Sequence, residues 1–260
     1  IGSALHIKAA SRGAKVTCEM GGKNAVIVMA DADLAKAAVA IRDGAFGSTG
    51  QRCTATSRVI AAESVKAELV ERLAAFAKGI KVGSGLDESV DMGPAVDEGQ
   101  FNTNLEYIEI AKSEGAKLVS GGGRPAGLPD GYFVEPTIFD DVKPEMRIFQ
   151  EEVFGPVLSV ATAKNLEEAL KVANSVEFGL TTSIFTQDIN HVMKFIDEVE
   201  TGMVHINEPT IGGEAQLPFG GVKSTGVGDR EMSEEGLHFF TELKTVFINY
   251  SGESGRAMIR

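Results

Sequence analysis

The chain has 260 residues and a formal net charge of −12 at pH 7, which argues against a nucleic-acid-binding surface and against docking on an anionic membrane. No apolar run approaches the ~20 residues that a transmembrane helix requires, and the N-terminus shows no signal-peptide pattern. We therefore expect neither nucleic acid nor membrane as a partner. Because the chain opens at Ile1 in the middle of a pattern, we interpret it as a fragment of a longer protein.

The chain alternates predicted strands and helices. The predicted helices cover residues 4–10, 34–45, 101–114, 165–176, 189–199 and 232–240, with another that starts at Ser64. The predicted strands cover residues 15–22, 25–29, 59–62, 116–119, 133–139, 180–185, 203–206 and 245–250, with another after residue 156. The predicted N-caps are Ser3, Asp31 with Asp33, Ser64 and Asn165. This order predicts an α/β fold, a parallel twisted sheet flanked by helices.

Two of the predicted strands carry a further expectation. Pro136 interrupts the strand over 133–139, which favours an edge strand or a bend because proline cannot donate to a ladder. The strand over 245–250 alternates apolar and polar residues and has no partner nearby in the sequence. We expect it to pair with another subunit or with a missing segment.

Cysteine and histidine usage bounds the chemistry. The two cysteines are Cys18 and Cys53, and the four histidines are scattered without the spacing of zinc ligands, so we expect no metal site. Two cysteines in an acidic chain fit a reducing compartment, and we expect a cytoplasmic protein. The sequence leaves open a disulfide between Cys18 and Cys53.

The stretch around Cys53 is the first candidate site. Cys53 follows a turn rich in glycine and small polar residues, and Arg52 and Arg58 flank it. A thiol is nucleophilic as its thiolate, and nearby positive charge lowers its pKa. We therefore predict a nucleophile with a lowered pKa at Cys53. The alternative is a buried cysteine that packs as a small hydrophobic residue.

Glu19 is the second candidate. It lies among Val16, Cys18 and Met20, directly before a glycine pair. Desolvation raises the pKa of a carboxyl group in such surroundings, so that it can act as a general base near neutral pH. The alternative is a surface carboxylate at the end of a strand.

Two later stretches also stand out. Glu151 and Glu152 precede Phe154 and a Gly-Pro turn, and residues 209–228 form a long loop with six glycines. A loop of this length inside a compact domain is more often functional than not.

Four motifs in register resemble the NAD(P)-dependent aldehyde dehydrogenases. They are Glu19-Met20-Gly21-Gly22-Lys23, Gly50-Gln51-Arg52-Cys53-Thr54-Ala55, Glu151-Glu152-Val153-Phe154-Gly155-Pro156-Val157 and Pro218-Phe219-Gly220-Gly221-Val222-Lys223. Cys53 follows Glu19 by 34 residues, which is the family's usual interval. The match is to about the C-terminal half of a family member. Within the family, the sequence is most similar to bacterial and archaeal enzymes of the 2-oxoglutarate semialdehyde type.

The resemblance implies the catalytic roles. Cys53 is expected to attack an aldehyde, to form a thiohemiacetal and then, after hydride transfer, a thioester. The backbone amide of Cys53 is expected to donate to the oxyanion. Glu19 is expected to be the general base that activates water for hydrolysis of the thioester.

The resemblance also implies NAD or NADP as the cofactor. Gly2 and Ser3 match the helix start that lies near the cofactor phosphates in relatives. Glu152 matches the residue that binds the nicotinamide ribose, and Phe154 matches the residue that packs near the nicotinamide ring. Phe219 and the loop over 209–217 are expected to line the substrate entrance.

The resemblance further divides the chain. Residues 1–22 are expected to be a remnant of the dinucleotide-binding domain, 23–226 the catalytic domain, 227–243 a C-terminal helix that returns to the cofactor domain, and 244–260 an oligomerisation strand and tail. A homodimer or homotetramer is implied. In relatives, an asparagine oxyanion donor and most of the cofactor domain lie upstream, and loss of one such donor costs ~10²–10³ in turnover. We therefore expect these 260 residues alone to be inactive as a dehydrogenase.

Arg52 indicates an anionic substrate such as a semialdehyde acid, unless it only lowers the thiol pKa or forms a salt bridge. Three other functions stay open. Acyl transfer to coenzyme A is typical of relatives that lack the glutamate, and a cofactor-independent thiol esterase would need a histidine beside Cys53. The third is a non-catalytic structural or oligomerising module.

Overall fold

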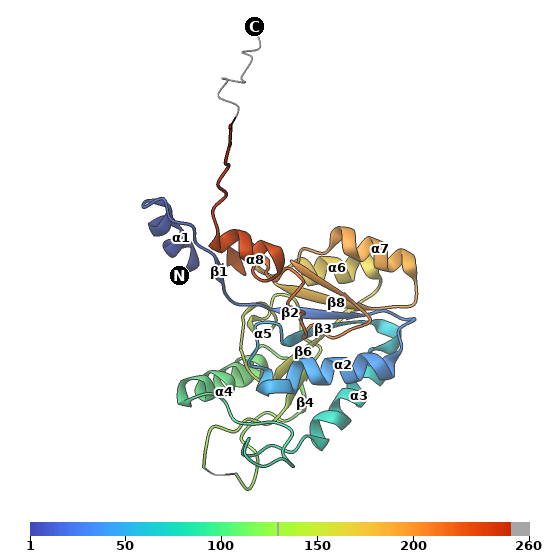
Figure 1. Cartoon of the computed structure of the whole chain (residues 1–260). Helices are drawn as coiled ribbons and strands as arrows, with labels where there is room; N and C mark the ends of the chain where they lie inside the picture. Colours follow the sequence, from blue (N-terminus) through green and yellow to red (C-terminus); the bar gives the residue numbers. More distant parts are fainter. Residues whose placement is uncertain (129, 251–260) are drawn as a thin grey trace.

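The computed structural model describes residues 1–128 and 130–250, and an open seven-stranded sheet organises them (Figure 1). The strands of this sheet, in spatial order, are β4 (Lys117–Ser120), β5 (Thr137–Asp140), β6 (Val157–Ala163), β3 (Thr56–Ala62), β2 (Asn24–Val28), β8 (Thr181–Phe185) and β9 (Met203–Ile206). The α-helices are α1 (Gly2–Ala10), α2 (Leu34–Phe46), α3 (Glu63–Gly79), α4 (Glu98–Ser113), α5 (Arg147–Gln150), α6 (Leu166–Asn174), α7 (Ile189–Glu198) and α8 (Ser233–Phe240). The α/β class predicted from the sequence is thus confirmed.

One edge of the sheet departs from the parallel arrangement that we predicted. Every neighbouring pair is parallel except β4 and β5, which are antiparallel. The connection between β4 and β5 contains no helix, and antiparallel neighbours need no crossover helix. The sheet is therefore mixed, with β4 as its antiparallel edge.

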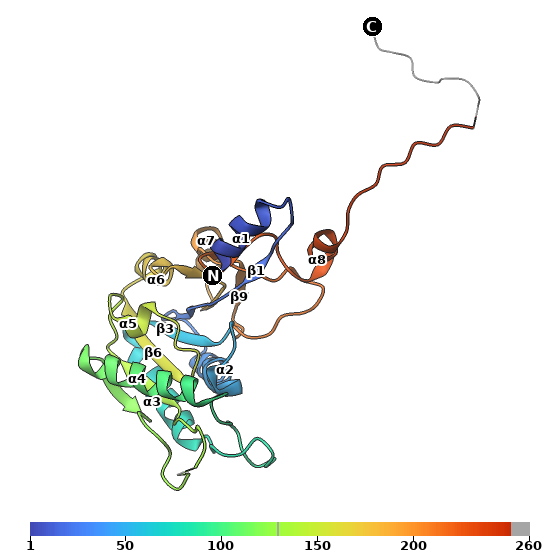
Figure 2. The same ribbon diagram turned by 90° about the vertical axis from the view of Figure 1, so that its left-hand side faces the viewer.

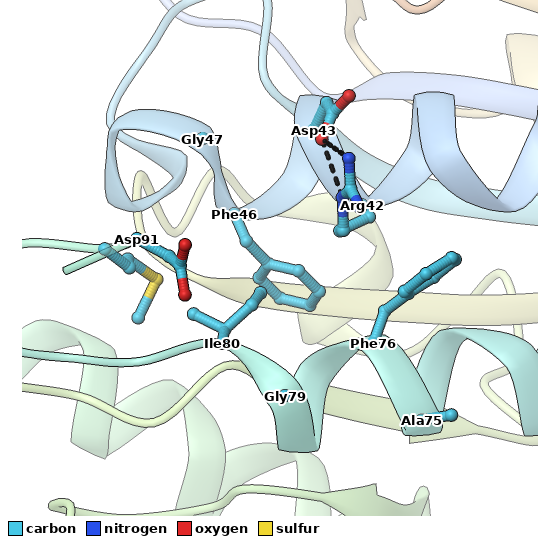
Figure 3. Close-up of a pocket in the computed structure, with 10 residues that line it drawn as sticks. Arg42, Asp43, Phe46, Gly47, Ala75, Phe76, Gly79, Ile80 and Asp91 are labelled. Carbon is cyan, nitrogen blue, oxygen red and sulfur yellow. Dashed lines mark hydrogen bonds and ion pairs between the residues drawn. The ribbon is translucent and has the colours of Figure 1, made fainter. Parts of the chain in front are cut away.

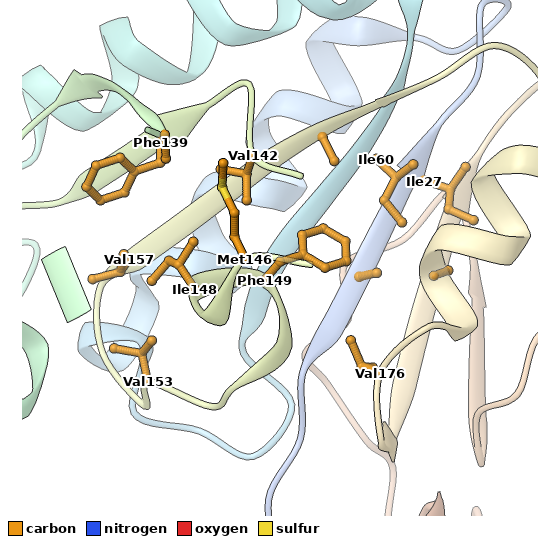
Figure 4. Close-up of a cluster of buried hydrophobic side chains, with 14 of the residues drawn as sticks. Ile27, Ile60, Phe139, Val142, Met146, Ile148, Phe149, Val153, Val157 and Val176 are labelled. Carbon is orange, nitrogen blue, oxygen red and sulfur yellow. The ribbon is translucent and has the colours of Figure 1, made fainter. Parts of the chain in front are cut away.

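Each face of the sheet carries its own hydrophobic core. Along β2, Val26 and Val28 pack with α2 and α3, whereas Ala25 and Ile27 pack with α4, α5, α6 and α7 on the opposite face. This alternation follows from the period of two along a strand. Figure 4 shows Ile27 and Ile60 of adjacent strands on the second face, beside Phe149 of α5. Both faces of the central strands are buried, as is usual for parallel strands.

Two short antiparallel pairs lie outside the main sheet. β1 (Cys18–Glu19) pairs with β11 (Gly226–Val227), and β7 (Phe178–Gly179) pairs with β10 (Val222–Lys223). The predicted strand over 15–22 is therefore shorter than expected. In both views, α1 and α8 project on the same side of the main body (Figure 2).

Two of the predicted caps are confirmed. Asp33 caps α2 by accepting hydrogen bonds from two backbone amides of the first turn, and Asn165 caps α6 by accepting one from the backbone amide of Glu168. Asp31 does not cap α2; its carboxylate instead accepts hydrogen bonds from the hydroxyl of Thr186 and the backbone amide of Gln187.

The other two predicted caps are wrong. α1 has Ile1 at its N-cap position and α3 has Ala62, and neither helix has a side-chain cap. Ser3 and Ser64 already lie inside the first turns, because each helix begins one or more residues earlier than predicted.

One strand prediction needs correction. The strand after Pro136 is β5, which lies between β4 and β6, so it is not an edge. Pro136 precedes the strand, where its missing N–H removes nothing from the ladder. Residues 245–250 pair with no strand of this chain and run away from the body (Figure 1). Their pairing with another subunit or with a missing segment stays a prediction. The rest of the predicted oligomerisation segment, 251–260, lies outside the described residues.

Within the described residues, no helix combines the length and apolar character needed to cross a membrane.

Candidate active site

The candidate site lies where the chain enters β2 and β3. Glu19 precedes β2 by a few residues, and Cys53 precedes β3. Because β2 and β3 are parallel neighbours, the segments that lead into them meet at the same edge of the sheet. We expected the Cys53 sulfur and the Glu19 carboxylate to face a common cavity at an edge of the α/β sheet, and the segments that carry them meet at one edge.

A tight turn holds Cys53 in place. The residues before it, Ser48, Thr49 and Gly50, have φ values of 52°, 61° and 64°. Left-handed backbone at a residue other than glycine costs of the order of 1 kcal/mol and is frequent at functional sites. A side chain at Gly50 would lie 2.3 Å from the carbonyl oxygen of Gly155, so this position requires glycine for close approach as well.

The side chain of Asn24 ties this turn to the sheet. Its Nδ2 donates to the carbonyl oxygens of Cys53 at 2.7 Å and Ala55 at 2.8 Å, and its Oδ1 accepts from the backbone amide of Thr181 at 3.3 Å. Asn24 is 2% exposed, so these bonds are shielded from water. Sequence reasoning missed this residue, because an asparagine at the start of an apolar strand gives no signal of such a role.

The pKa of Cys53 moves opposite to our prediction. Burial of the half-buried thiol raises its pKa, backbone amides of Thr54 and Cys53 lower it, and the carboxylates of Glu19 and Glu152 raise it further. Cys53 and Glu19 are therefore close enough for their charges to interact. Cys18 and Cys53 are both free thiols, so the disulfide that the sequence left open is absent.

The two arginines that flank Cys53 in the sequence lie in different environments. Arg52 is exposed to solvent. Arg58 is 2% exposed, and its guanidinium lies over the ring of Phe149 and donates to the carbonyl oxygens of Lys23 and Ala173. Neither arginine contributes to the pKa shift of Cys53.

The environment of Glu19 confirms the sequence expectation for its pKa. Burial raises the pKa of Glu19 to about 7, the carboxylate of Glu231 raises it as well, and the guanidinium of Arg230 lowers it. The Oε2 atom of Glu19 is buried without a hydrogen-bond partner. A Cβ atom at Gly220 would lie 2.7 Å from Oε1 of Glu19, so the backbone of Gly220 packs closely against this carboxyl group. A carboxyl group with this pKa can exchange a proton near neutral pH.

Glu231 and Arg230 are functional candidates that sequence reasoning missed. Glu231 reaches the site because its backbone forms two hydrogen bonds with Phe219, at 2.7 and 2.8 Å, across the glycine-rich loop. The available signal was the charged run Asp229-Arg230-Glu231 between this loop and the last helix.

Glu152 joins the same site through the glycine pair. Its Oε1 accepts a hydrogen bond from the backbone amide of Gly22 at 2.9 Å. A side chain at Gly21 would lie 2.4 Å from Oε2 of Glu152, so the pair forms a cradle that only glycine leaves open. Burial raises the pKa of Glu152, whereas the Gly22 amide and the charge of Lys23 lower it.

The other predicted cofactor-binding residues are Phe154, Gly2 and Ser3. Phe154 is 38% exposed and has a φ of 57°. Gly2 is buried against Met20, the residue after Glu19, which places the start of α1 beside β1. Ser3 is exposed on α1.

The loop over 209–228 contacts the nucleophile segment. The hydroxyl of Thr210 donates to the carbonyl oxygen of Thr54 at 2.8 Å and bonds the hydroxyl of Thr56 at 2.8 Å. Farther along the loop, Phe219 lines a cavity of about 200 Å³ together with His205 of β9. Burial lowers the pKa of His205, which favours the neutral imidazole.

A separate surface pocket of about 440 Å³ lies between the end of α2 and α3, with Phe46, Phe76 and Ile80 in its wall (Figure 3). Neither Cys53 nor Glu19 lines it. Among residues 1–128 and 130–250, no group of three or more His, Cys, Asp or Glu side chains is arranged to hold a metal ion.

One edge of the α/β sheet carries a half-buried thiol, backbone amides directed at its sulfur and a carboxyl group of pKa about 7. Such an arrangement can support covalent catalysis by cysteine. The sequence profile of the aldehyde dehydrogenase family matches residues 1–246. The chain belongs to the aldehyde dehydrogenase family.

Two relatives show how close the sequence match is. The chain is 48% identical over 250 residues to the alpha-ketoglutaric semialdehyde dehydrogenase of Bacillus subtilis strain 168, which covers 95% of this chain and 51% of that protein. It is 46% identical over 253 residues to the alpha-ketoglutarate semialdehyde dehydrogenase of Haloferax volcanii. This match covers 96% of this chain and 52% of that protein. The chain thus spans about half the length of the curated relatives it matches.

Solved structures of aldehyde dehydrogenases have the same fold as this chain. An NAD-dependent aldehyde dehydrogenase from Sinorhizobium meliloti matches with a TM-score of 0.90 at 34% identity, over 99% of this chain and 50% of that chain. The betaine aldehyde dehydrogenase of Staphylococcus aureus in complex with NAD⁺ matches with a TM-score of 0.86 at 37% identity, over 90% of this chain and 47% of that chain.

The effect of the neighbouring charges on the pKa of Glu19 can be tested by removing each charge in turn. Glu231→Gln should lower the pKa of Glu19 below about 7, because a neighbouring negative charge is removed. Arg230→Gln should raise it, because a positive charge is removed. Carbon-13 NMR titration of the glutamate carboxyl groups measures both shifts, with the Glu19 signal identified by its loss in Glu19→Gln. Shifts of the same sign in the two variants would contradict this account.

Proposed function

We propose that this chain is the catalytic part of an enzyme that oxidises an aldehyde to a carboxylic acid with NAD or NADP. The observation that carries the proposal is the meeting of Cys53 and Glu19 at one sheet edge, with the pKa of Glu19 raised to about 7. Membership of the aldehyde dehydrogenase family supports it.

The residues of the chain divide the chemistry between them. The thiolate of Cys53 attacks the aldehyde carbon and forms a thiohemiacetal, while backbone amides at Cys53 and Thr54 stabilise negative charge beside it. Loss of hydride from that carbon leaves a thioester on Cys53. Glu19 then takes a proton from water, which attacks the thioester and releases the acid and the thiol. Glu19 must be ionised for this step, so its rate should rise with pH through about 7.

The residues at the glycine cradle fit a nicotinamide cofactor. The backbone of Gly21 and Gly22 packs closely against the side chain of Glu152. The carboxylate of Glu152 can accept hydrogen bonds from ribose hydroxyls. Phe154 offers an exposed ring in the same turn. The cofactor, when bound, supplies the hydride acceptor. Gly2 and Ser3, at the start of α1, are proposed to lie near its phosphates.

The proposed domain organisation follows. Residues 1–22 belong to the cofactor domain, 23–226 form the catalytic domain, 227–243 return to the cofactor domain, and 244–260 serve oligomerisation. Because the chain spans about half the length of the relatives it matches, we propose that these 260 residues do not turn over NAD(P) on their own. Free thiols at both cysteines support a reducing compartment and a cytoplasmic location.

A direct test uses ester hydrolysis, which needs no cofactor. With p-nitrophenyl acetate, Cys53→Ala should abolish the burst of p-nitrophenol. Glu19→Gln should keep the burst and slow the following steady rate by about 10²–10⁴, because general-base catalysis contributes a factor of this size.

Cys18→Ala is the matched control and should behave like the unaltered chain. Loss of the burst in Cys18→Ala but not in Cys53→Ala would refute the assignment of the nucleophile. Unchanged steady turnover in Glu19→Gln would refute the assignment of the base.

We propose a semialdehyde that carries a carboxylate as the substrate. The exposed guanidinium of Arg52, next to Cys53, supports an anionic substrate, and the relative from Bacillus subtilis is an alpha-ketoglutaric semialdehyde dehydrogenase. In the complete enzyme, Arg52→Ala should raise KM for an acid semialdehyde about 2- to 5-fold and leave KM for a neutral aldehyde of equal length unchanged, because an exposed ion pair contributes less than about 1 kcal/mol. Equal losses on both substrates would remove Arg52 from substrate recognition. Arg72→Ala, on the exposed face of α3, is the control.

We also propose a homodimer or homotetramer. Val246, Phe247, Ile248 and Tyr250 are 64%, 79%, 68% and 95% exposed. Pairing of this segment as a strand with a second copy would bury part of this apolar surface. Deletion of residues 244–260 should therefore reduce the sedimentation coefficient to that of a monomer. Leu86→Asp, at a residue 97% exposed in a loop, should leave the assembly unchanged. An unchanged assembly after the deletion would exclude this role.

A further inference from the structure

One face of α4 holds the turn that carries Glu152. Gln100, Asn104 and Tyr107 follow one another at i, i+4 and i+7, so they lie on the same side of the helix. All three side chains face residues 151–155, as the contacts below show. None of the four motifs of the sequence analysis includes these residues.

Gln100 and Asn104 hold the far end of this turn. Nε2 of Gln100 donates to the carbonyl oxygen of Val153 at 2.8 Å and to Oδ1 of Asn104 at 2.9 Å. Asn104 is 0% exposed, and a side chain at Gly155 would lie 2.2 Å from its Oδ1. Gly155 therefore packs between Asn104 and Gly50 of the nucleophile turn, whose own Cβ position is 2.3 Å from the carbonyl oxygen of Gly155.

Tyr107 holds the near end through Glu151. Its hydroxyl donates to Oε2 of Glu151 at 2.6 Å, a short bond of the kind formed with an ionised acceptor. Arg147 of α5 donates to both oxygens of the same carboxylate, at 2.9 and 2.8 Å, and its guanidinium lies 5.6 Å from the centre of the Tyr107 ring. These bonds lower the pKa of Glu151 and keep it ionised.

Fixing Glu151 also fixes the direction of its neighbour. In extended backbone, successive side chains point to opposite sides, and Glu151 has extended dihedral angles of φ −96° and ψ 143°. With the Glu151 carboxylate bound to α4 and α5, Glu152 points the other way, toward Gly22 and Cys53, where its Oε1 accepts the Gly22 amide at 2.9 Å.

We propose that Tyr107 is a positioning residue for Glu152: its hydroxyl holds Glu151, and Glu151 directs the Glu152 carboxylate to the Gly21-Gly22 cradle. The consequence for cofactor binding rests on the proposed function, in which Glu152 contacts the nicotinamide ribose. Tyr107 itself does not touch the reacting atoms.

A first experiment needs no cofactor and tests the positioning alone. Iodoacetamide labelling of Cys53 is followed against pH in the unaltered chain and in Tyr107→Phe, Glu152→Gln and Tyr132→Phe. The Glu152 carboxylate raises the pKa of Cys53, so its neutralisation or departure should shift the labelling profile to lower pH. Tyr107→Phe and Glu152→Gln should shift it in this direction. Tyr132→Phe, which removes a hydroxyl from the tyrosine whose ring packs on Phe101 of the same helix, should not.

A profile for Tyr107→Phe that matches the unaltered chain, while Glu152→Gln shifts, overturns the proposal. A double-mutant cycle separates positioning from general loss of structure. Tyr107→Phe added to Glu151→Gln should produce no further shift if Tyr107 acts through Glu151, whereas additive shifts overturn that route. Urea unfolding of each variant verifies that the labelled chain is folded.

A second experiment uses the complete enzyme that contains this chain. Tyr107→Phe should raise KM for the nucleotide about 10-fold, with a smaller change in kcat, because a hydrogen bond to a charged group is worth a factor of this order. If Glu152→Gln leaves nucleotide KM unchanged, the proposed cofactor role of Glu152 fails while the labelling experiment still decides the positioning. If Glu152→Gln raises nucleotide KM and Tyr107→Phe does not, the positioning proposal fails.

Discussion

The hydrogen bonds of Asn24 are the contact on which the site depends. One amide side chain at the start of β2 bonds the carbonyl oxygens on either side of Thr54 and the backbone amide at the start of β8. Three chain segments are thereby fixed to one buried group. Buried backbone groups that lose a partner cost about 1–3 kcal/mol each, so the position of the Cys53 segment is coupled to the stability of the sheet itself.

This arrangement explains why the site occupies the less usual edge of the sheet. Parallel α/β sheets generally bind ligands at the carboxyl ends of their strands. Here Glu19 and Cys53 precede β2 and β3, at the amino ends. Segments that lead into strands need anchors of their own. The structure supplies Asn24 for the nucleophile turn and the glycine pair Gly21-Gly22 for Glu152, and α4 supports the opposite side of the Glu152 turn.

Much of the fold was predictable because it follows local rules. The apolar run of β2 and the cap of α2 at Asp33 gave correct elements. Glu19 and Cys53, in contrast, were assigned to one reaction through the resemblance of their motifs to a known family. The failures came where tertiary contacts decide. Arg58 was expected to lower the pKa of Cys53, but its guanidinium is used by backbone carbonyls and Phe149 inside the core. A neighbouring position in the sequence does not determine where a long side chain ends. Here the charges that raise the pKa of the thiol are carboxylates from other segments, Glu19 and Glu152.

Glu231 illustrates the limit most clearly. It lies more than two hundred residues after Glu19, and only the pairing of β1 with β11 and of Phe219 with Glu231 brings the two carboxylates together. No local pattern encodes such a pair. Its physical effect is nevertheless simple: burial and a second carboxylate destabilise the ionised form of Glu19, and Arg230, the residue before Glu231, opposes them. Because adjacent residues on one short segment supply the two opposing charges, any movement of that segment alters both together. The basicity of Glu19 therefore depends on how the loop after β9 closes over β1, a property of the folded chain and not of any motif within it.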